Sequence, residues 1–93
     1  MNKQRRKDTD NLLNDLRKVA EGVNLEDLKD QAEQLRDEEQ EYLDNMPESL
    51  QQGERGEAAQ QAVSFLEVAM DALETAFNSL EEAAAALEEA SGV

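Results

Sequence analysis

The sequence predicts an all-α fold: an antiparallel helical hairpin or a three-helix bundle with a long C-terminal helix. The first indication is a seven-residue phrase, Leu-Glu-x-Ala, which begins at Leu66, Leu73, Leu80 and Leu87. The second is a set of apolar residues three or four apart in the N-terminal half, and the third is a break around Pro47 that separates the halves. Leucine at every seventh position is typical of a long helix that packs against other helices.

The first helix is expected over residues 3–21. Its apolar side chains lie three or four residues apart and therefore share one face: Leu12, Leu16, Val19, Ala20 and Val23. Gly22 interrupts this pattern, and glycine weakens a helix interior by about 1 kcal/mol relative to alanine.

The second helix is expected over residues 25–45, with Asn24 as its N-cap and Asp27 in its first turn. Its apolar stripe is Leu28, Ala32, Leu35, Tyr42 and Met46, with Glu39 where another apolar residue was due. This stripe does not continue the phase of the first helix, so the backbone must break near residues 22–24. Both a turn between two helices and a kink in one long helix satisfy the pattern.

Residues 46–56 are expected to connect the second and third helices. Pro47 disfavours helical geometry in the residue before it and suits the first position of a new turn. Gly53 and Gly56 are typical of turns. Leu50 is expected to fold back and close this end of the bundle.

The third helix is expected over residues 57–90. Its apolar side comprises three rows of side chains spaced by seven: the four leucines above, an alanine row and a mixed row. The alanine row is Ala62, Ala69, Ala76, Ala83 and Ala90, and the mixed row is Val63, Met70, Phe77 and Ala84. These rows cover roughly half the helix cylinder, which is wider than the seam of a two-stranded coil. At least two neighbouring helices are therefore expected.

Two arrangements supply these neighbours within a single domain of residues 1–93. Either the N-terminal half folds back as two short helices, or it forms one kinked helix and the resulting hairpin pairs with a second copy. Self-association is expected, because a hairpin alone would expose much of the third helix. The candidate interface residues are Phe65, Met70, Leu73, Phe77 and Leu80, among which Phe65 lies at the margin of the apolar face.

The net charge of −14 is unevenly distributed. Residues 1–18 carry six basic and three acidic side chains, whereas residues 19–55 carry three basic and twelve acidic ones. Residues 56–93 carry eight acidic side chains and no basic one. Such a charge repels nucleic acid and anionic lipid and attracts basic partners. Direct nucleic-acid binding is therefore not expected, despite the basic segment from Lys3 to Lys7.

The residue types exclude several chemistries. The chain contains no Cys, His or Trp, so it has no disulfide, no Cys or His metal ligand and no Cys- or His-centred nucleophile. The densest acidic cluster, residues 37–44, lacks the glycine-containing turn of a calcium-binding loop. Di-iron bundles require a Glu-x-x-His motif. We therefore expect neither enzymatic activity nor a cofactor nor a metal, and interpret the cluster as a solvated surface.

Neither secretion nor membrane insertion is predicted. The basic N-terminus is not followed by an apolar run, unlike a secretory signal. The longest apolar run, residues 83–87, is too short to span a bilayer. A soluble cytoplasmic protein with no membrane partner is expected.

Rows of carboxylates suggest an acidic binding face. Carboxylates three or four residues apart lie about 5–6 Å apart at Cβ on a helix, and a rigid acidic rod could imitate the phosphate backbone of a nucleic acid. The candidate residues are Asp30, Glu33, Asp37 and Glu41 in the second helix and Glu67, Asp71 and Glu74 in the third. The expected partner is a basic host protein that binds nucleic acid.

The segment Tyr-Leu-Asp-Asn-Met-Pro-Glu at residues 42–48 follows an acidic helix and precedes the Leu-Glu-x-Ala helix. In this it resembles a family of small acidic proteins encoded by bacteriophages and prophages. The resemblance covers the second helix, the connection and the third helix. It implies a helical hairpin, a phage origin and a location in the host cytoplasm, but no assigned activity and no functional residues. Small phage proteins of this kind often bind and divert a host factor, including a defence system.

The function that follows is non-enzymatic protein binding, with inhibition of a host or defence protein through an acidic face. One alternative is a structural or assembly accessory oligomer. Another is a sponge for a small ligand held between subunits, with Lys3, Arg5, Arg6 and Arg55 as the basic residues that could line such a site.

Overall fold

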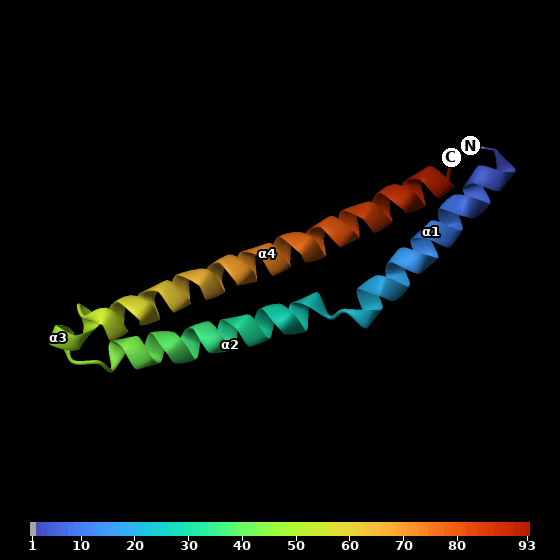
Figure 1. Cartoon of the computed structure of the whole chain (residues 1–93). Helices are drawn as coiled ribbons and strands as arrows, with labels where there is room; N and C mark the ends of the chain where they lie inside the picture. Colours follow the sequence, from blue (N-terminus) through green and yellow to red (C-terminus); the bar gives the residue numbers. More distant parts are fainter. Residues whose placement is uncertain (1) are drawn as a thin grey trace. The chain divides into compact units, whose positions relative to one another are not determined.

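The computed structural model describes residues 2–93, and within that range it contains four helices and no strand (Figure 1). The helices are α1 (Lys3–Gly22), α2 (Leu25–Asp44), α3 (Glu48–Gln51) and α4 (Glu54–Ser91). The all-α fold with a long C-terminal helix is confirmed. The packing divides into two compact units: unit 1 combines α1 with Thr75–Val93, and unit 2 is Glu26–Glu74.

A turn, rather than a kink, separates α1 from α2. The side chain of Asn2 accepts a hydrogen bond from the backbone N–H of Arg5 at 2.8 Å, which caps the start of α1. The helix ends at Gly22, and Val23 has an extended backbone (φ −121°, ψ 103°). Since α2 begins only at Leu25, the two N-terminal helices are separate elements.

The connection between α2 and α4 is more ordered than the sequence suggested. The backbone N–H groups of Leu50 and Gln51 donate to the carbonyl of Pro47 at 2.8 and 3.1 Å and form the short helix α3. The Gln51 side chain then donates to the carbonyls of Leu43 and Met46, at 3.1 and 3.0 Å. The Leu43 carbonyl also accepts from the backbone N–H of Met46 at 3.1 Å, so the Gln51 side chain adds a second bond there and ties α3 to the end of α2.

Gly56 was expected in a turn, but it lies inside α4, where the backbone of Gln51 comes close to it. It is buried, and a Cβ at this position would overlap the backbone of Gln51. At Gly53 a Cβ would meet only the carbonyl oxygen of Leu50, at an ordinary 3.5 Å. The absence of a side chain at Gly56 therefore lets α3 lie directly against the start of α4, which begins at Glu54 instead of the predicted residue 57.

Unit 2 is an antiparallel pair formed by α2 and the first half of α4 (Figure 1). Ala59 and Val63 are buried on α4, at 1% and 8% exposure. The less exposed residues that continue this seam are Leu66, Met70 and Leu73 on α4, and Lys29, Ala32, Arg36, Glu39, Leu43 and Met46 on α2. They alternate three and four residues apart, which is the spacing of helices that pack along one line.

The predicted stripe of α2 is only partly correct. Ala32 and Met46 lie on the seam, but Leu28, Leu35 and Tyr42 are exposed, at 41%, 54% and 49%. The seam instead includes Lys29 and Arg36, whose aliphatic stems lie along the contact while their charged ends reach carboxylates on α4. The helix is thus turned so that its apolar stripe flanks the contact.

Unit 1 pairs α1 with the second half of α4, again antiparallel (Figure 1). Leu13, which the periodicity did not single out, is the buried residue of α1, whereas the predicted face residues Leu12, Val19, Ala20 and Val23 are exposed. Polar contacts support this pairing: Arg17 forms an ion pair with Glu88, and the hydroxyl of Ser91 donates to Asp10.

The alanine row of α4 is largely uncovered. Ala69, Ala76 and Ala83 are exposed, and only Ala62 and Ala90, near its ends, are partly covered. Within either unit α4 packs against a single long helix, so its wide apolar side is only partly covered by this chain, and the second neighbouring helix stays a prediction. In residues 2–93, no helix has the length and apolarity needed to cross a membrane.

Candidate acidic binding face

The seven predicted carboxylates lie on one face of unit 2. On α2, the acidic residues lie on the same side of the contact line as Arg36, and on α4 they lie on the same side as Glu67. Arg36 and Glu67 contact each other across the pair, with Nη1 and Oε1 3.7 Å apart, so the two sides form one surface. All seven side chains are exposed; they are Asp30, Glu33, Asp37, Glu41, Glu67, Asp71 and Glu74. We call this surface the acidic face.

Two cations lie at the centre of the acidic face. The Nε of Arg36 donates to Oδ1 of Asp37 at 2.8 Å, and its Nη2 is 3.8 Å from Oε1 of Glu33. The Nζ of Lys29 is 3.4 Å from Oε2 of Glu74. Together with the contact between Arg36 and Glu67, these pairs engage four of the seven carboxylates.

Three of the seven carboxylates have no ion-pair partner among the described residues. Asp30, Glu41 and Asp71 form no ion pair within the part of the chain that the structure describes. Seven acids and two bases leave the acidic face with a net charge of −5. The acidic face therefore has two cations near its centre, each paired with carboxylates, and further carboxylates around them without an ion pair.

The charge of Arg36 is held firmly in place. The hydrogen bond to Asp37 raises the pKa of the guanidinium above its ordinary value, and the nearby charges of Asp37, Glu67 and Glu33 act in the same direction. Arginine is already charged near neutral pH, and the raised pKa of Arg36 favours the charged form further. A basic partner would have to compete with this residue for the central carboxylates.

Sequence reasoning missed the cations of this face. Arg36 stands three residues after Glu33 and next to Asp37, and this spacing could have indicated a local ion-pair cluster. The contacts with Glu67 and Glu74 could not have been found in the same way. They cross between helices, and therefore depend on which residues of α2 and α4 lie opposite one another.

The candidate interface residues occupy two different environments. Met70 and Leu73 are half-buried in unit 2, and Phe77 and Leu80 are half-buried in unit 1. These four lie on the seam where α4 packs against the chain's own helices. Phe65, by contrast, is 72% exposed and lies away from that seam.

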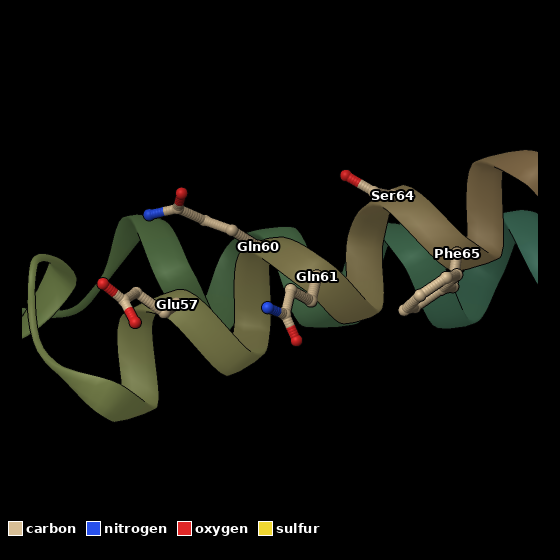
Figure 2. Close-up of a pocket in the computed structure, with 5 residues that line it drawn as sticks. All are labelled: Glu57, Gln60, Gln61, Ser64 and Phe65. Atoms are coloured by element: carbon tan, nitrogen blue, oxygen red, sulfur yellow. The ribbon is translucent and has the colours of Figure 1, made fainter.

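Two open hollows lie on the surface of unit 2. One is an open depression lined only by α4, through Glu57, Gln60, Gln61, Ser64 and Phe65 (Figure 2). Another lies at the connection and is lined by Tyr42, Asn45, Met46, Pro47, Leu50 and Arg55. Across residues 2–93, no three acidic side chains converge in a way that could hold a metal ion.

Searches of protein-family models, of curated proteins and of solved structures return no match to this chain.

Proposed function

We propose that this protein is a non-enzymatic binding module of the phage type, whose acidic face binds a basic surface on a host or defence protein. The supporting observation is the collection of seven exposed carboxylates on one face of unit 2. Basic surfaces that bind nucleic acid do so mainly through the phosphate charges. An acidic face of net charge −5 can occupy such a surface in place of the nucleic acid.

The rigidity of the two helices supports this proposal. Carboxylates on a helix are held at fixed spacings, so a partner need not order them on binding, and less conformational entropy is lost. The contacts of Arg36 and Lys29 with α4 also hold the two rows together. The partner's lysines and arginines would find Asp30, Glu41 and Asp71 free of competing cations, so these three should contribute most to binding.

A matched pair of triple variants tests this proposal. The first, Asp30→Asn with Glu41→Gln and Asp71→Asn, removes three charges from the acidic face. The control, Glu81→Gln with Glu82→Gln and Glu89→Gln, removes three exposed charges from the C-terminal part of α4. Both variants have the same net charge, so they differ only in where the charge was lost.

The measurement is a titration of each variant against a panel of purified basic nucleic-acid-binding proteins at several salt concentrations. For the true partner, we expect the face variant to bind at least about tenfold more weakly, which corresponds to roughly 1.4 kcal/mol, and to show a shallower salt dependence. The control should bind nearly as well as the unaltered protein. Equal weakening in both variants would show attraction to the overall charge and not to this face.

A second candidate function is that of a structural or assembly accessory oligomer. It is favoured by the large apolar side chains that unit 2 leaves exposed, among them Leu35 and Phe65. A scaffold of this kind should form assemblies whose size grows with protein concentration and should need no host partner.

A further inference from the structure

Unit 2 has a second, apolar face. On α2 it consists of Leu28, Leu35 and Tyr42, which are seven residues apart and are 41%, 54% and 49% exposed. On α4 it consists of Phe65, which is 72% exposed, together with Ala62, Ala69 and Ala72. We call these seven residues the apolar face.

The apolar face lies on the opposite side of unit 2 from the acidic face. Leu28 and Leu35 each precede a cation of the acidic face, Lys29 or Arg36, by one residue, and one residue turns a helix by about 100°. On α4 the same turn separates Leu66, on the seam, from Phe65. Because the two helices are antiparallel, these turns lead to the same face of the pair.

This face carries no charge where it crosses α4. Along this side of α4 the residues are four alanines and one phenylalanine, spaced four or three apart: Ala58, Ala62, Phe65, Ala69 and Ala72. That absence is notable in a chain whose residues are 34% charged. Water contact with such a surface is unfavourable, at about 25 cal/mol per Å² of apolar area.

The exposed area of the chain is large enough to supply a dimer contact. The chain exposes 6916 Å², whereas a folded monomer of 10.4 kDa exposes about 5400 Å². The excess of about 1500 Å² lies within the roughly 1000–2500 Å² that each subunit of an obligate homodimer buries. The buried core is correspondingly small, since Leu13, Ala59 and Val63 are the buried apolar side chains among the described residues.

We propose that the apolar face is the contact surface for a second copy of this chain, so that two copies of unit 2 form a four-helix bundle. The mixture of side-chain sizes on the face favours this occupant. In a two-fold contact every patch meets its own copy, and here the large Phe65 can lie against the small Ala69 or Ala72 of the other copy. Alanines also allow the two α4 backbones to approach closely.

Charge favours the same arrangement. Two chains of net charge −14 repel each other, and the repulsion is smallest when the acidic faces point away from the contact and are screened by salt. Packing through the apolar faces achieves this and leaves both acidic faces exposed on the outside. The dimer is therefore compatible with partner binding and does not depend on it.

The first test is the mass of the intact protein by sedimentation equilibrium, for the unaltered chain and for two double variants. Leu35→Glu with Phe65→Glu places two charges in the apolar face. The control, Gln34→Glu with Ser64→Glu, places the same charges one residue earlier on each helix, pointing elsewhere. Figure 2 shows Ser64 and Phe65 projecting in different directions from α4.

We expect twice the chain mass of 10.4 kDa for the unaltered protein and the control, and a single chain mass for the face variant. A single chain mass for the unaltered protein at all concentrations would overturn the proposal, as would a dimeric face variant. High salt should strengthen the dimer, because it screens repulsion without weakening apolar contact.

A second measurement does not depend on the face variant folding. The chain has no cysteine, so Phe65→Cys and Ser64→Cys each introduce a single thiol. Alkylation at position 65 should slow as protein concentration rises, while alkylation at position 64 should not change. Equal rates at both positions across all concentrations would contradict an interface at this face.

Discussion

The two packed units of this protein use the same plan with different core packing. In each, a helix from the N-terminal half runs antiparallel to part of α4, and arginine pairs with glutamate across the contact. Unit 2 buries Gly56, Ala59 and Val63. Among the described residues of unit 1, Leu13 is the buried one. Small residues near α3 thus bring the backbones of unit 2 together, while unit 1 packs around Leu13 with half-buried side chains such as Phe77 and Leu80.

The difference shows how two similar helix pairs can be stabilised unequally. Near α3, the connection is short, Gln51 bonds to the end of α2, and Gly56 allows direct backbone contact. These contacts position the two helices at the α3 end of unit 2 without a large buried side chain. In unit 1 the positioning must come from side chains, most of which are exposed on α1.

The largest effect should come from Gly56→Ala. A Cβ at this position overlaps the backbone of Gln51, and backbone cannot move aside as a flexible side chain can. We expect a loss of about 3 kcal/mol or more in unfolding free energy, measured by urea denaturation. Gly53→Ala is the control, because a Cβ there has ordinary space. Equal stability of the two variants would show that the close approach at Gly56 is unimportant.

An intermediate effect is expected from Leu13→Ala. Removing the buried side chain of unit 1 should cost about 2–3 kcal/mol and should speed amide exchange in α1 more than in α2. Leu12→Ala, at a neighbouring leucine that is 56% exposed, should cost much less. If both changes cost the same, Leu13 would not be the residue that holds α1 against α4.

The smallest effect should come from the ion pairs, and it sharpens the distinction between the units. Arg36→Met removes a cation that contacts three carboxylates, whereas Arg17→Met removes one that pairs with Glu88. Thermal denaturation at low salt should show a larger drop for the Arg36 variant than for the Arg17 variant. Both drops should shrink at high salt, because exposed ion pairs are screened. A drop that persists unchanged at high salt would contradict a screened ion pair, because methionine keeps the length of the arginine stem and removes only its charged end.

Much of the secondary structure could be predicted from the sequence. Residues 3–21 and 25–45 were expected to be helical, and α1 and α2 end within one residue of these bounds. Such boundaries follow from local causes: glycine and proline weaken helices where they occur, and leucine spacing indicates helix over any window of residues. The start of α4 was predicted three residues late, because Gly56 was interpreted as a turn residue when its role is to admit α3.

The candidate site was predicted only in part for a similar reason. Periodicity assigned the seven carboxylates to two rows, but not the cations between them. The positions of Lys29 and Arg36 opposite Glu74 and Glu67 depend on the register between helices, which no single helix contains.

The sequence by itself determined the all-α fold, the acidic charge and the residue types that exclude Cys- or His-based chemistry, since these depend on local spacing and composition. Only the tertiary structure decided which stripe of each helix is covered. Both α2 and α4 carry apolar side chains on more than one side. The sequence of a single helix does not specify which of these sides another helix will cover. Leu35 is exposed and Arg36 lies on the seam because of where α4 lies against α2.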